Sequence, residues 1–484
     1  MLKSEYATSA EAHSANKNVC IDVTDLINYA RYNNTVSGIQ RVIIKIITTF
    51  VNEHGLDRVE LIAFDLKKRK FIRTKATFFA GEYAYDQFRM CKHFNTSVIF
   101  SKPGLLGLRG YLTARYRNPV VYGFHFCRIY LNNKLSGGRS FAKRNISETD
   151  MLASINVPLA EWRDADFDEN DLVLILGATW DFPGFVAALA EARTKKPFRI
   201  YQFIHDLIPI VIPEHMPLGV PERFKKWLDD VLNVTDVTLA NSQATALDIA
   251  RYAQLTGRAP LDIRTVPLAH EYVLPVPQSV AQAHISVFND GKLKLPHHAT
   301  QRVVAVAVEP YALVVGTIES RKNILRLLQI WKHLVQTQGP RTFNLILAGK
   351  SAELKNVQEF LASSGKIDGK VRIVDRPDDA EVAFLYANCQ FSICLSYYEG
   401  WGLPIGESMW FGRPVLASRS SSMPEVGGDL IDYCDPADDN EIEAQLLRLM
   451  FDAGYLKKRA DALDRGSMRT WDQVISKIWE EVTA

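Results

Sequence analysis

The sequence predicts an α/β protein with two consecutive domains, each built around a parallel β-sheet. Short runs of β-branched residues alternate with amphipathic stretches of 10–17 residues, which is typical of strand–helix–strand units. This alternation stops between about residues 272 and 309 and then starts again, so the 484-residue chain divides in two. With 47% hydrophobic and 23% charged residues, the composition excludes a wholly disordered chain, a collagen and a coiled coil.

The first half contains a regular series of strands and helices on either side of a long insertion at about residues 66–170. Its first helix, at residues 38–51, carries apolar side chains on one face, namely Ile39, Val42, Ile43, Ile46 and Ile47. We expect strands at residues 19–23, 59–64, 172–176, 200–204 and 237–240, and further helices at residues 185–193, 221–232 and 244–252.

The second half repeats the alternation without an insertion. The proline-containing stretch before it, which includes the adjacent His297 and His298, is predicted to be an interdomain linker rather than a metal site. We expect strands at residues 311–315, 343–347, 371–374, 391–395 and 414–417, and helices at residues 322–335, 352–362, 380–387, 404–410 and 440–451. In such folds the ligand site lies at the carboxyl ends of the strands.

The net charge of +2 hides a basic segment at residues 66–145, which has 17 lysines and arginines against two acidic residues. The same segment is rich in phenylalanine and tyrosine. A basic, aromatic surface suits anionic lipid headgroups, and each cation contributes about 1 kcal/mol near such a surface. Nucleic-acid binding and a simple solvated insertion are the alternatives; we expect no nucleic acid partner.

Six cysteines are scattered through the chain without a C-x-x-C pair, which favours reduced thiols over disulfides or a zinc site. No run of about 18 apolar residues is present, and the first twenty residues lack an apolar core. We therefore expect a cytoplasmic protein, which would be peripheral on the inner face of the cytoplasmic membrane if the basic segment binds lipid. Asp378 and Asp379, and the group Asp435, Asp438 and Asp439, precede helices and are predicted to be helix caps rather than metal ligands.

Two motifs in the second half indicate an anion and sugar site. In GTIESRKN, a strand ends at Gly316 and two cations, Arg321 and Lys322, stand where a helix is expected to begin. Cations there oppose the helix dipole unless an anion is bound between them and the backbone amides. In EGWGLPIGE, Pro404 suits the first turn of a helix, the glycines allow a ligand to approach the backbone, and the two carboxylates can hold sugar hydroxyls.

The sequence resembles the retaining glycosyltransferases of family 4, which have the GT-B fold. The resemblance is carried by residues 311–323, 399–407 (the E-x7-E motif) and 412–428. In the first half it is carried by VSGIQRV at residues 36–42, HDLIP at residues 205–209 and, more weakly, Asn241-Ser242. It implies two Rossmann-like domains facing across a cleft. The predicted boundaries are an acceptor domain at residues 1–285, a linker at 286–309, a donor domain at 310–467, and a C-terminal helix at 468–484 that crosses back to the first domain.

Carried over by position, the resemblance assigns roles to individual residues. Lys322 would bind the donor diphosphate, Glu399 the transferred sugar and Glu407 the ribose, while His205 would lie near the reacting carbon. The catalytic residues predicted are therefore Lys322, Glu399 and His205. The other donor-binding residues predicted are Gly38, Gly316, Thr317, Arg321, Gly400, Trp401, Gly402 and Leu403, with backbone amides also implied around Pro404, which has no N–H of its own. Many relatives have an arginine in place of Thr317, so one phosphate cation is unassigned, with Arg321 and Arg41 as stand-ins.

The implied reaction moves a hexose from a nucleotide-diphosphate sugar to an acceptor hydroxyl, with retention at the anomeric carbon and without a metal or other cofactor. The combined motifs most resemble bacterial mannosyltransferases of polysaccharide assembly, which implies GDP-mannose and a lipid-linked or polysaccharide acceptor of O-antigen, exopolysaccharide or capsule. UDP-sugars and dTDP-rhamnose stay open as donors. A non-catalytic nucleotide-sugar-binding scaffold and a nucleic-acid-binding protein are the alternatives of another class. A dehydrogenase is disfavoured because no G-x-G-x-x-G follows the first strand.

Overall fold

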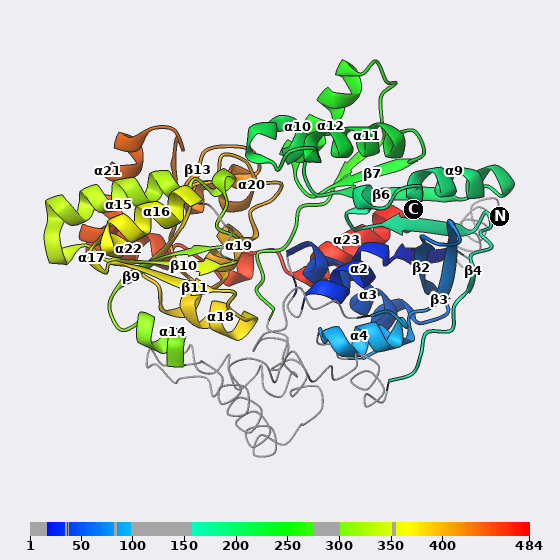
Figure 1. The fold of residues 1–484 in the computed structure, drawn as a ribbon, viewed down its shortest axis with the longest axis horizontal. Helices are drawn as coiled ribbons and strands as arrows, with labels where there is room; N and C mark the ends of the chain where they lie inside the picture. Colours follow the sequence, from blue (N-terminus) through cyan, green and yellow to red (C-terminus); the bar gives the residue numbers. More distant parts are fainter. Residues whose placement is uncertain are drawn as a thin grey trace, which may run out of the picture. The chain divides into compact units, whose positions relative to one another are not determined.

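A computed structural model describes residues 17–33, 36, 38–81, 85–97, 157–273, 301–350 and 355–484. The chain divides into two compact units, which Figure 1 shows coloured along the sequence. The first unit contains Met1–Gln202, Asp230–Asp236 and Val482–Ala484, and the second contains Phe203–Asp229 and Val237–Glu481. The predicted linker lies mostly outside the described residues, although its end forms the short helix α14 (Gln301–Val306).

The first sheet has the strand order β4-β3-β2-β1-β5-β6-β7-β8. Strand β1 pairs in parallel with β2 on one side and with β5 on the other, whereas β3 runs antiparallel to β2. The elements of the first unit are β1 (Asn18–Asp22), α2 (Thr24–Tyr32), α3 (Gly38–His54), β2 (Val59–Asp65), β3 (Lys70–Lys75), α4 (Gln87–His93), β4 (Arg163–Asp164), β5 (Asp171–Ile175), α9 (Phe185–Lys195) and β6 (Arg199–Ile204).

Strand β3 corrects the prediction that residues 66–170 are simply an insertion with a basic, aromatic surface. Phe71, Phe79 and Phe88 are buried in the core, and the guanidinium of Arg73 lies buried between the carboxylates of Glu60 and Asp171. The sequence did not reveal this pairing, because the two carboxylates come from other strands of the sheet, Glu60 from β2 and Asp171 from β5. The part of the segment at residues 98–145 lies outside the described residues.

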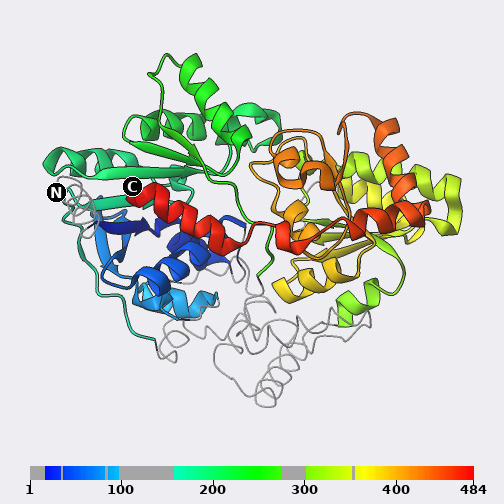
Figure 2. The ribbon, with the colours of Figure 1, turned by 180° about the vertical axis from the view of Figure 1, so that it is seen from behind.

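The second unit contains a six-stranded sheet in the order β11-β10-β9-β12-β13-β14, with parallel neighbours. Its strands are β9 (Tyr311–Val315), β10 (Asn344–Gly349), β11 (Val371–Asp375), β12 (Phe391–Cys394), β13 (Val415–Ser418) and β14 (Asp432–Cys434). Its helices include α15 (Ile324–Gln338), α16 (Lys355–Ser363), α18 (Asp379–Asn388), α19 (Leu403–Trp410), α20 (Met423–Gly427), α21 (Asp439–Phe451), α22 (Ala453–Asp461) and α23 (Trp471–Thr483). Figure 2 shows α23 in red, seen from behind.

Alternation along β9 explains why helices cover both faces of this sheet. Ala312 and Val314 pack with α15, α16 and α21, whereas Tyr311 and Leu313 pack with α18 on the opposite face. The same unit contains α10 (Ile208–Val211), α11 (Val220–Leu232), β7 (Val237–Ala240), α12 (Gln243–Leu255) and β8 (Ile263–Thr265). The predicted alternation is thus present, with β8 and β14 as strands that the sequence did not reveal.

Candidate active site

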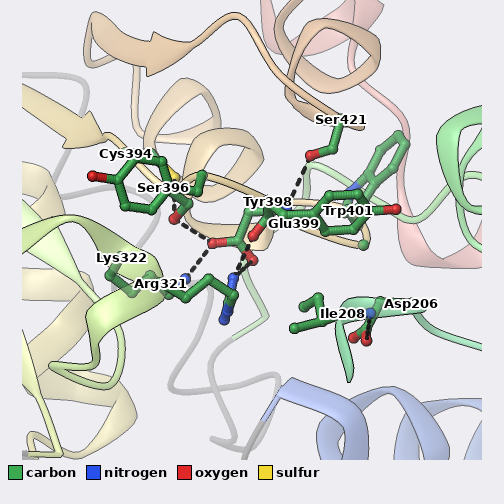
Figure 3. Close-up of polar contacts among 12 residues, drawn as sticks. Asp206, Ile208, Arg321, Lys322, Cys394, Ser396, Tyr398, Glu399, Trp401 and Ser421 are labelled. Carbon is green, nitrogen blue, oxygen red and sulfur yellow. Dashed lines mark hydrogen bonds and ion pairs between the residues drawn. The ribbon is translucent and has the colours of Figure 1, made fainter. Parts of the chain in front are cut away.

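The site is formed by two loops that follow adjacent strands. Because β12 pairs in parallel with β9, both strands end at the same edge of the sheet and their loops lie side by side. The first loop carries Arg321 and Lys322, and the second carries Ser396 and Glu399. Figure 3 shows these side chains converging on the Glu399 carboxylate. A small cavity beside them is lined by Lys322, Cys394 and Ser396 together with apolar residues.

Glu399 has charged partners on both carboxylate oxygens. Oε1 accepts from Lys322 Nζ at 2.5 Å and from Ser396 Oγ at 2.6 Å, and Oε2 lies 2.9 Å from Arg321 Nη1. The backbone amide of Glu399 donates to Ser421 Oγ at 2.9 Å. Glu399 is only 8% exposed, so these partners replace the water that an ionised carboxylate needs.

Burial alone would raise the pKa of Glu399. The charges of Lys322 and Arg321, and the hydrogen bonds from Lys322 and Ser396, outweigh that effect and lower the pKa to about 2. Glu399 is therefore an anion at every physiological pH. It can accept hydrogen bonds from sugar hydroxyls but has no proton to donate.

Arg321 joins the two loops. Its Nη1 donates to the carbonyl oxygen of Tyr398 at 2.6 Å, its Nη2 donates to Glu319 Oε1 at 2.7 Å, and its own carbonyl accepts from the Tyr397 amide at 3.0 Å. The predicted helix at residue 322 begins instead at Ile324. Residues 320–322 form a 3-10 turn, and Asn323 has a positive φ of 58°, which interrupts the helical path.

The backbone at His205 comes so close to position 400 that only glycine fits there. A Cβ atom there would lie 2.0 Å from the carbonyl oxygen of His205 and 2.9 Å from Asp206 Cβ. Gly402 has a φ of 103° and precedes α19, which begins with Leu403 and has Pro404 in its first turn, as the sequence predicted. Residues 205–206 therefore pack directly against the loop that carries Glu399.

Asp206 adds a second carboxyl group near Glu399 and Arg321. Burial raises the pKa of Asp206, and the Ile208 amide, whose nitrogen lies 3.0 Å from Asp206 Oδ1, and the charge of Arg321 partly offset this rise. The ring of His205 packs against Phe203 with centroids 4.9 Å apart. The structure thus places the Asp206 carboxyl within electrostatic reach of Glu399 and Arg321.

The remaining predicted donor residues are distributed as follows. Glu407 lies one turn into α19, where its Oε2 accepts from the Tyr386 hydroxyl at 3.1 Å. The Trp401 side chain is buried at 3% exposure, so a ligand meets this residue through its backbone. Gly316 and Thr317 directly follow β9, and a Cβ at Gly316 would be 3.6 Å from Lys322 Nζ. Gly38 and Arg41 belong to α3 in the first unit. The ligand-binding roles of all these residues stay predictions.

Sequence reasoning missed the polar residues that hold the second loop in place. The Ser422 hydroxyl donates to the carbonyl oxygens of Glu399 and Trp401, and the Tyr398 hydroxyl donates to the Asp248 carboxylate. Glu425 accepts from the backbone amides of Gln243 and Ala244 at the start of α12. These contacts join residues more than twenty positions apart, so no local spacing could reveal them.

Of the acidic residues predicted to be caps, Asp378 and Asp438 are helix N-caps, whereas Asp379 and Asp439 are the first residues of α18 and α21. Asp378 forms a capping box with Glu381 at α18, and Asp438 accepts from the amides of Asn440 and Glu441 at α21. Within the part of the chain that the structure describes, no three histidine, cysteine, aspartate or glutamate side chains cluster as metal ligands would. Among those same residues, no helix is long and apolar enough to cross a bilayer.

Comparison with known proteins finds relatives of one kind. The family described as glycosyl transferases group 1 matches residues 301–466. The chain is 30% identical over 272 residues to the O-antigen chain mannosyltransferase B of Escherichia coli, covering 55% of this chain and 66% of that protein. It is 26% identical over 217 residues to the GDP-mannose:cellobiosyl-diphosphopolyprenol alpha-mannosyltransferase of Xanthomonas campestris, covering 40% of this chain and 56% of that protein.

The chain thus spans about two thirds or less of the length of these curated relatives. Among solved structures, HepE of Anabaena in complex with UDP and glucose is similar over 96% of this chain and 99% of that one, with a TM-score of 0.55 and 13% identity. This similarity concerns the fold. The predicted α/β class with two Rossmann-like, parallel-sheet domains, the GT-B class, is confirmed.

Proposed function

Residues 301–466 belong to the group 1 glycosyl transferases, and from that premise we propose that the protein transfers a hexose from a nucleotide-diphosphate sugar to a bacterial surface glycan or its lipid-linked precursor. The observation that carries the proposal is the buried Glu399 carboxylate between Lys322 and Arg321, at the carboxyl ends of β9 and β12. A carboxylate beside two cations can hold sugar hydroxyls next to a diphosphate.

In the proposed reaction, the bond between the anomeric carbon and the diphosphate oxygen breaks as the acceptor hydroxyl oxygen bonds to that carbon, and the hydroxyl proton passes to an oxygen of the departing diphosphate. Negative charge grows on the leaving diphosphate, and Lys322 and the amides before α19 stabilise it. Glu399 would orient the transferred sugar, Glu407 would bind the ribose, and His205 would lie near the reacting carbon.

We propose retention of configuration by attack on the face that the diphosphate leaves. A covalent mechanism would need a free, nucleophilic carboxylate in the site. Glu399 is a weak nucleophile because two cations and Ser396 occupy its oxygens, and Glu407 accepts from the Tyr386 hydroxyl. NMR analysis of the product's anomeric centre tests retention directly.

GDP-mannose is the proposed donor, because the relatives from Escherichia coli and Xanthomonas campestris are named as mannosyltransferases and one is named for GDP-mannose. The proposed acceptor is a lipid-linked or polysaccharide chain of O-antigen, exopolysaccharide or capsule, used on the inner face of the cytoplasmic membrane. UDP-sugars and dTDP-rhamnose are the alternative donors.

The first experiment is a thermal-shift panel with GDP, UDP, ADP and dTDP and their common sugar conjugates, followed by a transfer assay with the sugar that binds. A ligand at 100 times its dissociation constant stabilises the folded protein by about 2.7 kcal/mol. A shift selective for GDP and GDP-mannose supports the proposed donor. A shift with another nucleotide would identify a sugar conjugate of that nucleotide as the donor instead. Binding without transfer to any glycan or lipid-linked acceptor would favour a nucleotide-sugar-binding scaffold instead.

We further propose that the reaction needs no metal, since Lys322 and the backbone amides at the start of α19 supply positive charge at the diphosphate. Dialysis against EDTA should leave the rate unchanged. Loss of activity that Mg²⁺ or Mn²⁺ restores would contradict this.

A further inference from the structure

The buried guanidinium of Arg321 is engaged by three acceptors from two loops. Tyr398 O and Glu399 Oε2 share its Nη1, and Glu319 Oε1 accepts from Nη2. The residue is only 9% exposed. Lys322, its neighbour, is similarly buried, but its Nζ contacts the Glu399 carboxylate alone.

We propose that Arg321 is a positioning residue of the transfer reaction, which fixes the Glu399 carboxylate and the backbone of Tyr398, and that it does not itself bind the donor diphosphate. This inference rests on the proposed glycosyltransferase function. It also assigns Lys322 as the phosphate cation of this loop, although Thr317 stands where relatives have an arginine.

The geometry favours positioning over direct phosphate binding. A planar guanidinium that already meets two carboxylates and a carbonyl would have to abandon buried partners to reach a phosphate, leaving those partners unpaired. Lys322 has one flexible ammonium group, which can move from Glu399 to a phosphate without breaking several hydrogen bonds at once. Arg321 also ties the two loops together through its backbone, because its carbonyl accepts from the Tyr397 amide.

Fixing Glu399 has a measurable electrostatic consequence. The groups that face its carboxylate are Lys322 and Arg321 from the first loop, Ser396 and the Cys394 thiol from β12 and its loop, and Asp206 from the segment after β6. Only Lys322 and Arg321 in this set are cations, and Asp206 opposes them. Removal of the arginine charge should therefore raise the pKa of Glu399 from its lowered value, while Lys322 and Ser396 still oppose the effect of burial.

The experiment compares Arg321→Gln, Arg321→Lys and Lys322→Ala in the full chain. The control is Arg341→Gln, which removes an exposed arginine that lies over the Phe451 ring. For each variant we would measure the melting temperature, the Kd for GDP by calorimetry, and kcat and KM between pH 4 and 9.

For Arg321→Gln we expect the Kd for GDP to stay close to that of the wild type, while kcat falls by about 100-fold because Glu399 is displaced. The acidic limb of kcat should move to higher pH, which a purely structural defect would not cause. Arg321→Lys should restore much of the wild-type pH profile but not kcat, because one ammonium cannot serve three acceptors. Lys322→Ala should instead weaken GDP binding by about tenfold or more.

A Kd for GDP that rises in Arg321→Gln as much as in Lys322→Ala would assign Arg321 to the diphosphate and overturn the inference. An unchanged kcat and pH profile in a folded Arg321→Gln protein would overturn it as well. If Arg321→Gln does not fold, Arg321→Lys decides by kcat: a large fall in kcat at an unchanged Kd for GDP supports positioning, and a wild-type kcat overturns the inference. Failure of the proposed function is distinguishable, since the wild-type protein would then transfer no sugar at all.

Discussion

Glu399 and Lys322 form the closest ion pair of the candidate site, with 2.5 Å between Oε1 and Nζ. If Lys322 binds the donor diphosphate as proposed, donor binding would change the partners of this pair, because the diphosphate would bring negative charge to a place where Glu399 already neutralises the lysine. Sugar hydroxyls arriving with the diphosphate would then donate to Glu399. The proposed donor binding is therefore an exchange of partners within one ion pair.

Replacing Lys322 with alanine should lower kcat by about 10²–10³-fold, the effect of losing one preorganised group that stabilises the charge of a leaving oxygen. A matched control is Lys355→Ala, since the Lys355 side chain is 88% exposed and pairs only with Glu359 on α16. Steady-state rates at saturating donor measure the effect. Turnover at the wild-type rate in a folded Lys322→Ala protein would remove this residue from the mechanism.

Asp22 makes stability depend on pH. Burial raises the pKa of Asp22 to about 7, although Thr24 donates to its carboxylate. The folded protein thus keeps the proton to higher pH than the unfolded chain does, and the free energy of unfolding falls as the pH rises from about 4 through 7. Asp22→Asn removes this dependence while its amide oxygen still accepts from Thr24.

Urea unfolding at pH 5 and pH 8 tests the pH effect. The free energy of unfolding of Asp22→Asn minus that of the wild type should be larger at pH 8 than at pH 5, by on the order of 2–4 kcal/mol. Asp57→Asn is the control, because that side chain is 95% exposed. Equal effects of Asp22→Asn at both pH values would show that Asp22 is ionised in the folded protein throughout.

At the scale of elements, helix starts and helix ends place the functional groups. Gly402 ends one loop with a left-handed conformation so that α19 can begin at Leu403, and Glu407 follows one turn later. The C-terminal helix α23 buries an apolar face, with Val474, Ile475 and Ile478 at 1% exposure or less. Arg264 pairs with Glu481 on this helix, and Lys17 donates to the carbonyl oxygen of Thr483 near its end.

Truncation of Ile478 to alanine should cost about 2–5 kcal/mol of unfolding free energy, because it leaves a cavity under α23. Glu480→Ala on the exposed side of the same helix should change it by less than about 0.5 kcal/mol. Deletion of residues 471–484 should lower the melting temperature further. A truncated protein that melts with the wild type would contradict a structural role for α23.

At the scale of the whole molecule, the charge distribution is uneven, with 17 cations against two acidic residues in the segment 66–145. Arg73 is paired in the core, so it does not contribute to a basic surface. A membrane-binding surface would depend on the other cations of the segment, many of which are at residues 98–145, outside the described residues.

Vesicles containing anionic lipid should co-sediment the protein at low salt and release it as salt is added, because each lysine or arginine near the surface contributes about 1 kcal/mol that ions screen. Neutral vesicles are the control. Absence of co-sedimentation with anionic vesicles at low salt would exclude this surface as a membrane-binding one. Binding to random oligonucleotides with a charge density like that of the vesicles would instead favour a nucleic-acid partner.

The alternation of strands and helices, the two loops of the candidate site and the helix caps could be predicted from the amino-acid sequence. Each of these depends on residues near one another in the chain, such as Pro404 after Gly402 or Asp378 before Glu381. Periodicity and capping are local properties, so a single sequence displays them.

Contacts between side chains far apart in the chain are visible in the folded protein alone. Arg73 lies between Glu60 and Asp171, His205 packs against Gly400, and Arg321 pairs with the carboxylate of Glu399. These arrangements arise where parallel strands bring loops from separate parts of the chain to one edge of a sheet. The charge state of Glu399 follows from the contact between these loops. Burial and two neighbouring cations set its pKa, and the E-x7-E spacing does not.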